Sequence, residues 1–202
     1  MHISTSVPAG GLYTLKPAFQ RLLGRTADGL ANQGVHPDVL TGAAVGVAVL
    51  GGLALGTGGL WLVPLLACVR LTLNALDGMV AVRLGLARPW GKVLNELADR
   101  LADLAFFGPL LLLPALNTPL VVAALVSMLL VSYLGVLAEA AGAGRQYGGL
   151  MGKADRMLWL GVACVASAAT SAWLPLQALP AVLLVGGLVT LVQRGIRTHA
   201  AV

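Results

Sequence analysis

Long runs of apolar residues constrain this chain more than any other feature. Hydrophobic residues make up 58% of its 202 residues and charged residues only 10%, and the mean hydropathy is +0.88. A helix needs about 20 mostly apolar residues to cross a bilayer, and the chain contains several runs of that length. We therefore expect an integral membrane protein that forms a single domain over residues 1–202.

Six apolar segments predict six transmembrane helices, so the expected fold class is an all-α integral membrane protein. The segments lie at about residues 39–59, 60–82, 94–116, 120–140, 157–173 and 176–192, within a membrane core of residues 37–193. In the first segment Gly42 and Gly46 stand four apart, and Gly52 and Gly56 repeat the spacing. Such spacing lets helices approach closely in lipid, although small residues are also simply common in membrane helices.

Residues 12–34, before the first segment, have the pattern of an amphipathic helix. Leucines and Phe19 recur there at helical spacing, with Lys16, Arg21 and Arg25 between them. This pattern predicts an N-terminal amphipathic helix that lies in the membrane interface. The alternative is a short helix that packs on its own protein.

Basic residues alternate along the chain in a way that predicts its orientation. The connections at residues 56–59, 117–119 and 171–180 carry no Lys or Arg. The other connections and the two terminal regions carry Lys16, Arg21, Arg25, Arg83, Arg88, Lys92, Arg145, Lys153, Arg156, Arg194 and Arg197. Under the positive-inside rule, both termini and the basic loops are expected in the cytoplasm, with the protein in the cell (plasma or inner) membrane.

The acidic residues are concentrated in one short stretch. Four of the eight, Asp77, Glu96, Asp99 and Asp103, lie between residues 74 and 104. A charge inside a membrane is costly, so an acidic residue there is a functional candidate by default. The concentration predicts a site at the ends of the second and third segments.

Helical spacing places the polar side chains of this stretch on two facing surfaces. Asn74 and Asp77 stand three apart near the end of the second segment, and Asn95, Asp99 and Asp103 stand four apart at the start of the third. The short connection predicts antiparallel neighbours, so the two polar faces are expected to meet. Carboxylate and amide oxygens suit Mg²⁺ or Mn²⁺. The sequence therefore predicts a divalent metal site, with Mg²⁺ or Mn²⁺ as the cofactor and these five residues as ligands.

The same stretch resembles the signature of the CDP-alcohol phosphatidyltransferases, D-x2-D-G-x2-A-R-x8-G-x3-D-x3-D. Asp77, Gly78, Ala81, Gly91 and Asp99 fall on this pattern without gaps. The letters HPDVLT before the first segment look like the P-N-x-x-T pattern of the family, and other segments look like a divergent bacterial branch of it. The resemblance covers most of the chain, and it implies the six-helix fold with an interfacial N-terminal helix.

Two metal-binding positions of the signature are changed. Asn74 stands where the family has its first Asp, and Asn95 stands where it has its third. Asn offers a carbonyl oxygen to a metal ion but brings no negative charge and cannot act as a base. We therefore expect Asn74 and Asn95 as neutral ligands. Either Asp103 or Glu96 compensates for the lost charge, or the site holds one ion in place of two.

The resemblance also implies where the cytidine diphosphate group binds. Gly78, Ala81, Arg83 and Gly91 are expected to contact it, with Arg83 following Val82 at the position where the family has Arg. A glycine beside acidic residues allows a phosphate to approach the backbone closely. Taken singly, each glycine is also explained by helix packing or by a helix start.

The activity implied by the resemblance is the transfer of a phosphatidyl group. The donor is a CDP-linked lipid, CDP-diacylglycerol or a related compound, and CMP is released. The acceptor is a hydroxyl group of a small polyol, free or phosphorylated. Asp77 and Asp99 are carried over as metal ligands, and Asp99 is also carried over as the catalytic base that takes the proton of the acceptor.

The loop before the fifth segment carries three further basic residues, Arg145, Lys153 and Arg156. Three cations on one side of the membrane are suited to hold a phosphate group of the acceptor. The alternative is that they only obey the positive-inside rule.

The expected partners are the lipid donor, the alcohol acceptor and membrane lipids, and the resemblance implies a homodimer. No nucleic-acid partner is expected, because no soluble basic domain is present to bind one. The alternative function is a catalytically degenerate member of the same fold, or a small membrane transporter or scaffold, in which the two Asn residues mark lost chemistry.

Overall fold

The computed structural model describes residues 10–202, and in this range the protein is entirely helical. The first nine residues of the predicted domain, 1–202, lie outside the described range. The elements are η1 (Leu12–Leu15), α1 (Lys16–Leu22), α2 (Gly24–Asn32), α3 (Pro37–Gly56), α4 (Leu62–Arg83), α5 (Pro89–Phe107), η2 (Gly108–Leu112), α6 (Thr118–Ala140), α7 (Lys153–Thr170) and α8 (Leu174–His199). The predicted all-helical architecture is confirmed.

Each of the six apolar segments corresponds to one of the helices α3 to α8, with shifted ends. The largest shift concerns the third segment, expected at residues 94–116, because α5 begins at Pro89 and the chain leaves regular helix after η2. Pro109 lies in η2 and cannot donate a helical hydrogen bond, which explains the early end of α5. The last helix, α8, continues to His199, beyond the expected end at residue 192.

Four of the helices in the described range, α3, α4, α6 and α8, are long and apolar enough to cross a membrane. The other two long helices, α5 and α7, carry several charged residues, among them Glu96, Asp99 and Asp103 of α5. Many leucine, valine and tryptophan side chains are exposed on the outside of the bundle. Soluble monomers rarely expose so much apolar surface, which fits a protein surrounded by lipid; six spans remain a prediction.

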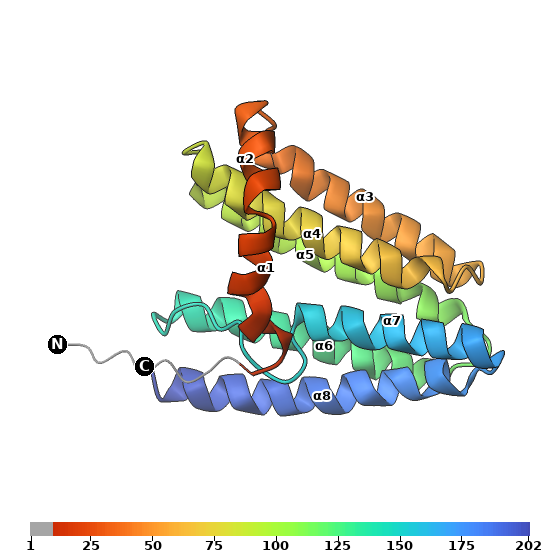
Figure 1. Ribbon diagram of the computed structural model, residues 1–202. Coiled ribbons are helices and arrows are strands. Elements are labelled where there is room, and N and C mark those ends of the chain that lie inside the picture. Colours follow the sequence, from red (N-terminus) through yellow and green to blue (C-terminus); the bar gives the residue numbers. More distant parts are fainter. Residues whose placement is uncertain (1–9) are drawn as a thin grey trace.

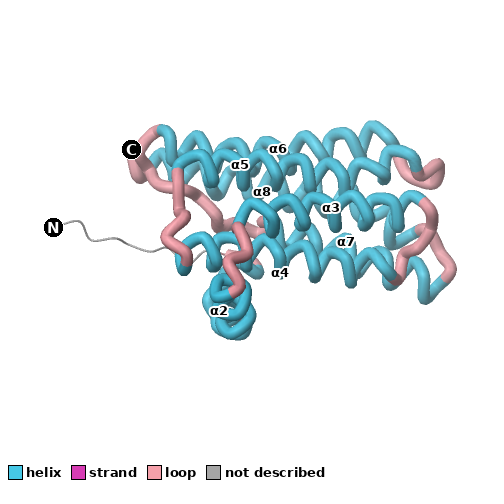
Figure 2. The backbone as a smooth tube through the Cα atoms, turned by 90° about the horizontal axis from the view of Figure 1, so that it is seen from above, coloured by secondary structure: helices cyan, strands magenta, loops and turns pink. Residues whose placement is uncertain are grey.

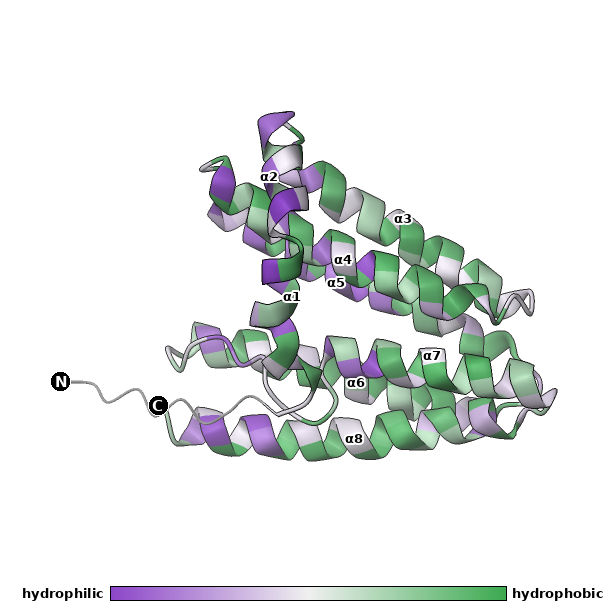
Figure 3. Ribbon diagram, viewed as in Figure 1, coloured by the Kyte–Doolittle hydropathy of each residue, from purple (hydrophilic) through white to green (hydrophobic). Residues whose placement is uncertain are grey.

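The six long helices form two groups of three. Helix α3 packs against both α4 and α5, whereas α8 packs against both α6 and α7. The two groups meet where α4 contacts α7 and where η2 and α5 contact α6. Figure 1 shows the two groups diverging toward the left end of the view, where the α4–α5 and α6–α7 connections and the C-terminus lie. This end is called the polar end below, because hydrophilic residues gather there in Figure 3.

The N-terminal segment crosses both groups at the polar end. Figure 2 looks along α2, which lies across the direction of the long helices. Ala27 of α2 is buried together with Leu40, Leu76 and Val80 of the first group. At its other end, the backbone N–H of Leu12 donates to Asp155 Oδ1 of α7 at 2.8 Å. The segment therefore connects the two groups of helices.

The predicted single amphipathic helix over residues 12–34 is wrong in one respect, because the segment is divided into η1 and two short helices. The alternative, packing on its own protein, is confirmed for α2. Helix α2 packs on its own protein through Ala27, whereas Leu15 and Leu22 are exposed. Its position in the membrane interface stays a prediction.

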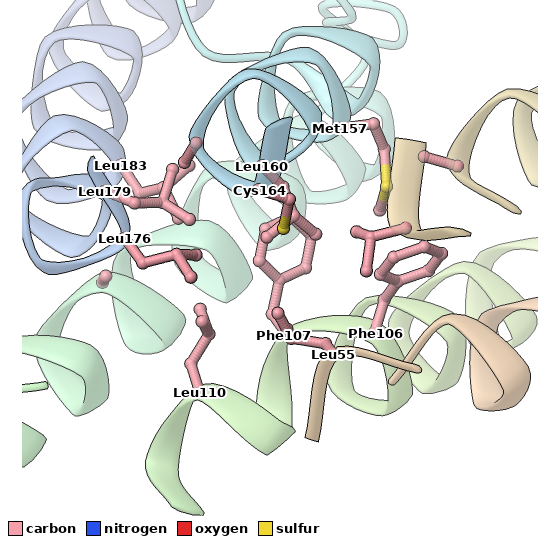
Figure 4. Packing of buried hydrophobic residues seen from close by; sticks show 14 of the residues in the cluster. Leu55, Phe106, Phe107, Leu110, Met157, Leu160, Cys164, Leu176, Leu179 and Leu183 are labelled. Carbon is pink, nitrogen blue, oxygen red and sulfur yellow. The ribbon is translucent and has the colours of Figure 1, made fainter. Parts of the chain in front are cut away.

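The apolar core lies toward the other end of the bundle and joins the two groups. Phe106 and Phe107 of α5 are fully buried, and they lie among Leu55, Leu160 and Leu176 in the close view of Figure 4. These side chains come from α3, α5, α7 and α8. Burying each such side chain contributes about 1.5–3 kcal/mol in water; in lipid, close packing replaces most of this term.

Close approach of α3 to α5 depends on two adjacent glycines. A Cβ atom on Gly51 would overlap the ring of Phe106, and one on Gly52 would overlap the carbonyl oxygen of Ala105. By contrast, a Cβ atom on Gly42 or Gly46 would meet nothing within 4 Å. In α3, Gly51 and Gly52 therefore serve close packing against α5.

Candidate functional site

The motif residues of α4 and α5 meet at the polar end through two crossed pairs of side chains. Asn74 Nδ2 of α4 donates to Asp99 Oδ1 of α5 at 3.1 Å, and Asn95 Nδ2 of α5 donates to Asp77 Oδ2 of α4 at 2.9 Å. The predicted meeting of the two polar faces is therefore present in the structure. Both helices pack mainly against α3, so these four side chains bridge the space between α4 and α5.

Asp77 is the most buried of the four, with 3% of its surface exposed. Its Oδ2 also accepts a hydrogen bond from Thr41 Oγ1 at 3.0 Å, and its Oδ1 accepts one from the backbone N–H of Gly78 at 2.5 Å. Thr41 belongs to the letters HPDVLT, whose resemblance to a family pattern was noted without a role for this residue. The structure places it beside the site.

Asp99 is held by a cation from the other group of helices. Lys153, the first residue of α7, places its Nζ 2.6 Å from both Asp99 Oδ1 and Asp99 Oδ2. The same Nζ lies 2.5 Å from Asn74 Oδ1. The sequence predicted Lys153 as a ligand of an acceptor phosphate and gave no indication of this contact, because 54 residues separate Lys153 from Asp99.

Asp103, one turn further along α5, has different neighbours from Asp99. Its carboxylate pairs with Arg70 Nη2 at 2.9 Å and with Arg156 Nη1 at 3.3 Å, and all three side chains are almost completely buried. Two guanidinium groups neutralise this carboxylate and fix its orientation. A metal ion would therefore have to compete with two arginines for this carboxylate. The role of Asp103 as a metal ligand stays a prediction.

The three residues predicted to bind an acceptor phosphate all lie near the polar end but have separate partners. Arg145 Nη2 pairs with Glu96 Oε1 at 2.5 Å, Lys153 pairs with Asp99, and Arg156 pairs with Asp103. The Nε atoms of Arg145 and Arg156 are buried and have no hydrogen-bond partner among the described residues. Buried donors of this kind usually find a partner, so an anion near them would be stabilised.

Helix α8 fixes the loop that carries Arg145 and leads to Lys153 and Arg156, which the structure places in the first turn of α7 and not in the loop as predicted. Thr190 Oγ1 accepts from the backbone N–H of Met151 at 2.8 Å. Arg194 donates to the carbonyl oxygens of Val131, Tyr147 and Gly148 at 2.6 to 2.9 Å. The start of α7, and with it Lys153, is therefore held in a defined position by residues far away in the sequence.

Of the residues predicted to bind cytidine diphosphate, Gly78, Ala81 and Arg83 lie in the last two turns of α4 and Gly91 lies in the first turn of α5. A Cβ atom on Gly78 would meet no protein atom within 4 Å, so helix packing does not account for this glycine. Gly91 lies in the first turn of α5, next to the side chain of Arg88. Arg83 pairs with Asp28 of α2 and also donates to the carbonyl oxygen of Met79 at 3.3 Å.

The donor set of the crossed pairs fits a divalent metal ion but is poor in charge. It offers two carboxylates and two amides, all with oxygen atoms of the kind that Mg²⁺ and Mn²⁺ bind. The described residues contain no group of three or more His, Cys, Asp or Glu side chains that could hold a metal ion. Asp77 and Asp99, with the oxygens of Asn74 and Asn95, therefore fit one ion better than two.

Two relatives are similar to this chain over most of its length. The inner membrane protein YnbA of Escherichia coli is 36% identical over 167 residues, which are 81% of this chain and 83% of YnbA. The phosphatidylinositol phosphate synthase of Mycobacteroides abscessus is 31% identical over 186 residues, which are 89% of this chain and 84% of that enzyme. No family model matches the chain.

Two solved structures of a phosphatidylinositol phosphate synthase are also similar to this chain. A crystal structure of the Mycobacterium tuberculosis phosphatidylinositol phosphate synthase with CDP-DAG bound is 29% identical, covers 88% of this chain and 94% of its own, and gives a TM-score of 0.74. The same enzyme in complex with manganese and citrate is 28% identical, with the same TM-score and 88% of each chain covered.

Proposed function

Because this chain belongs to the CDP-alcohol phosphatidyltransferase family, we propose that it transfers a phosphatidyl group from CDP-diacylglycerol to a hydroxyl group of a small polyol and releases CMP. The observation that carries the proposal is the meeting of Asn74 and Asp77 with Asn95 and Asp99 across two helices at the polar end. The relatives support the donor, since the Mycobacterium tuberculosis enzyme has CDP-DAG bound.

The proposed cofactor is Mg²⁺ or Mn²⁺, in line with the manganese complex of the Mycobacterium tuberculosis enzyme. The ligands available to it are the carboxylates of Asp77 and Asp99 and the amide oxygens of Asn74 and Asn95. When bound, a divalent ion withdraws charge from the diphosphate and stabilises CMP as the leaving group. The open side of Gly78 gives the diphosphate room to approach the backbone of α4.

Asp99 is the proposed base. The acceptor hydroxyl oxygen attacks the phosphorus on the lipid side, the bond from that phosphorus to the CMP oxygen breaks, and the hydroxyl proton passes to Asp99. A carboxylate accepts about four hydrogen bonds. Asn74 and Lys153 supply three of them, two to Oδ1 and one to Oδ2, so Oδ2 retains a position for the acceptor hydroxyl.

For the acceptor, we propose a polyol that carries a phosphate group. The support is the pair of buried Nε atoms of Arg145 and Arg156 that lack a partner in the described structure. A charge-assisted hydrogen bond to a phosphate oxygen would satisfy such a donor. Serine, which has no phosphate, would leave both unsatisfied.

The proposed placement in the cell follows from the charges. Both termini, the basic loops and the site are assigned to the cytoplasmic side, the six helices α3 to α8 to the membrane and the whole of residues 1–202 to one domain. The gathering of hydrophilic residues at the polar end supports this assignment.

The homodimer implied by the resemblance also stays a proposal, which light scattering of the purified protein would test.

The test of the proposed function is CMP release by the purified protein in mixed micelles. CDP-diacylglycerol is supplied with inositol phosphate, glycerol phosphate, inositol, glycerol or serine, each with and without Mg²⁺ or Mn²⁺. Metal-dependent CMP release with one phosphorylated polyol is the expected result. No release with any acceptor, from folded protein that still binds CDP-diacylglycerol, would favour the degenerate alternative.

A further inference from the structure

We propose that the ammonium group of Lys153 takes the place of a second divalent cation, so that this site binds a single metal ion through Asp77 and Asn95. The inference rests on the proposed function, because it concerns the metal ion of that site. It divides the site into two halves. One half consists of Asp77, Asn95 and Thr41, and the other consists of Asn74, Asp99 and Lys153.

The contacts of Lys153 are those of a cation among oxygen ligands. Its Nζ lies 2.5 Å from Asn74 Oδ1 and 2.6 Å from each oxygen of Asp99. An ammonium group has three donors, and three oxygens from two different helices surround it here. A divalent ion bound by the same oxygens would have to displace this group.

The other half contains no cationic side chain among the described hydrogen-bond partners of Asp77. Thr41, Asn95 and the backbone of Gly78 donate to its carboxylate. These neutral donors fix the carboxylate without cancelling its charge. Because Asn95 donates through Nδ2, its Oδ1 is available to a metal ion beside Asp77.

The charge of the site favours one metal ion over two. Asp77 and Asp99 carry two negative charges, and two cations lie beside Asp99: Lys153 and Arg100, whose Nη2 is 3.8 Å from Asp99 Oδ2. The site is therefore neutral without a metal ion. One divalent ion brings it to two positive charges, and a second would raise it to four positive charges within a small, partly buried volume. Like charges at this spacing repel strongly where water is scarce.

The position of Lys153 is set by the fold. The preceding loop is anchored on α8 through Thr190 and Arg194, and Asp155 Oδ2 accepts from the backbone N–H of Gly152 at 3.0 Å. The side chain is only 23% exposed and that of Asp99 13%. The second group of helices thus places the ammonium group of Lys153 against oxygens of the first group.

The experiment that tests this inference measures Mn²⁺ binding to the purified full-length protein in detergent micelles. Electron paramagnetic resonance of free Mn²⁺ during a titration gives the number of bound ions and the Kd. Low-temperature spectra show spin coupling when two Mn²⁺ ions are close. The chains compared are the unmodified protein, Lys153→Met, the matched control Lys92→Met, and the triple variant Asn74→Asp, Asn95→Asp, Lys153→Met.

The unmodified protein is expected to bind one uncoupled Mn²⁺ ion per chain. Lys153→Met is expected to lower the Kd by about tenfold, because a cation next to the ion is removed. Lys92→Met, whose ammonium pairs with Glu139 instead, is expected to leave the Kd unchanged. The triple variant is expected to bind two coupled ions.

Two coupled ions in the unmodified protein, or a Kd that Lys153→Met raises or leaves unchanged, would overturn the inference while leaving the proposed function intact. No Mn²⁺ binding by folded protein, as judged by circular dichroism, would overturn the metal dependence of the proposed function and this inference with it. Binding of two ions by the triple variant would also show that the site still folds when Lys153 is replaced.

Discussion

The two groups of helices contribute opposite halves of the site. The first group, α3 to α5, supplies oxygen ligands from a motif that is continuous in the sequence. The second group, α6 to α8, supplies three cations, Arg145, Lys153 and Arg156, from the loop before α7 and the first turn of α7. The comparison shows that a short motif can define the ligands of a site while its electrostatic balance is decided by distant residues.

Within the first group, the two acids of α5 also differ from each other. Asp99 faces Asn74 and a lysine at the partly exposed edge of the site, whereas Asp103 is enclosed by two arginines. The first is the proposed base, and the second pairs with α4 through Arg70 and with α7 through Arg156. The following predictions test this difference, from the largest expected effect to the smallest.

Replacing Asp99 by Asn removes the proposed base but keeps the shape of the side chain. General base catalysis contributes a factor of about 10²–10⁴, so CMP release is expected to fall by this factor in the micelle assay. Lys92→Met, outside the site, is the control. Unreduced CMP release by Asp99→Asn would remove Asp99 from its catalytic role.

Replacing Asp103 by Asn leaves Arg70 and Arg156 buried without their counter-charge. Breaking a buried ion pair from one side costs about 3–5 kcal/mol, so the midpoint of thermal unfolding in detergent is expected to fall by several degrees. Removing one of the two buried cations with Arg70→Met in the same chain is expected to recover part of the loss. An unchanged midpoint in Asp103→Asn would contradict the structural role of this acid.

Replacing Gly52 by Ala pushes α5 away from α3, because the added Cβ atom overlaps the carbonyl oxygen of Ala105. Overpacking of this kind costs about 1–3 kcal/mol, and the displaced α5 is expected to lower CMP release as well. Gly46→Ala in the same helix is the matched control, since its Cβ atom meets nothing within 4 Å. Equal effects of the two substitutions on thermal unfolding would refute the close-packing argument.

Replacing Glu139 by Gln breaks the exposed pair between Lys92 of the first group and Glu139 of the second. The two side chains are 56% and 34% exposed, and exposed pairs contribute about 0.2–1 kcal/mol. We expect a small fall in the midpoint of thermal unfolding that disappears at high salt, and unchanged CMP release. A loss as large as that of Asp103→Asn would show that the exposed connection between the groups matters as much as the buried one.

The sequence by itself predicted the all-helical fold and the meeting of the polar side chains of α4 and α5. Apolar runs of about 20 residues reveal buried or membrane helices because the requirement is local. The spacing of Asn74, Asp77, Asn95 and Asp99 reveals their shared faces because helical periodicity is local too. The shifted end of α5 at Pro109 and the division of residues 12–34 into separate helices were missed, because helix ends depend on packing as well as on propensity.

Only the tertiary structure decided which cation each carboxylate contacts. Arg70 of α4 pairs with Asp103, and Lys92 pairs with Glu139 across the two groups of helices. Lys153 reaches Asp99 because α8 anchors the preceding loop. A contact between residues far apart in the sequence has no periodicity to reveal it, so the charge balance of this site follows from how the two groups of helices pack.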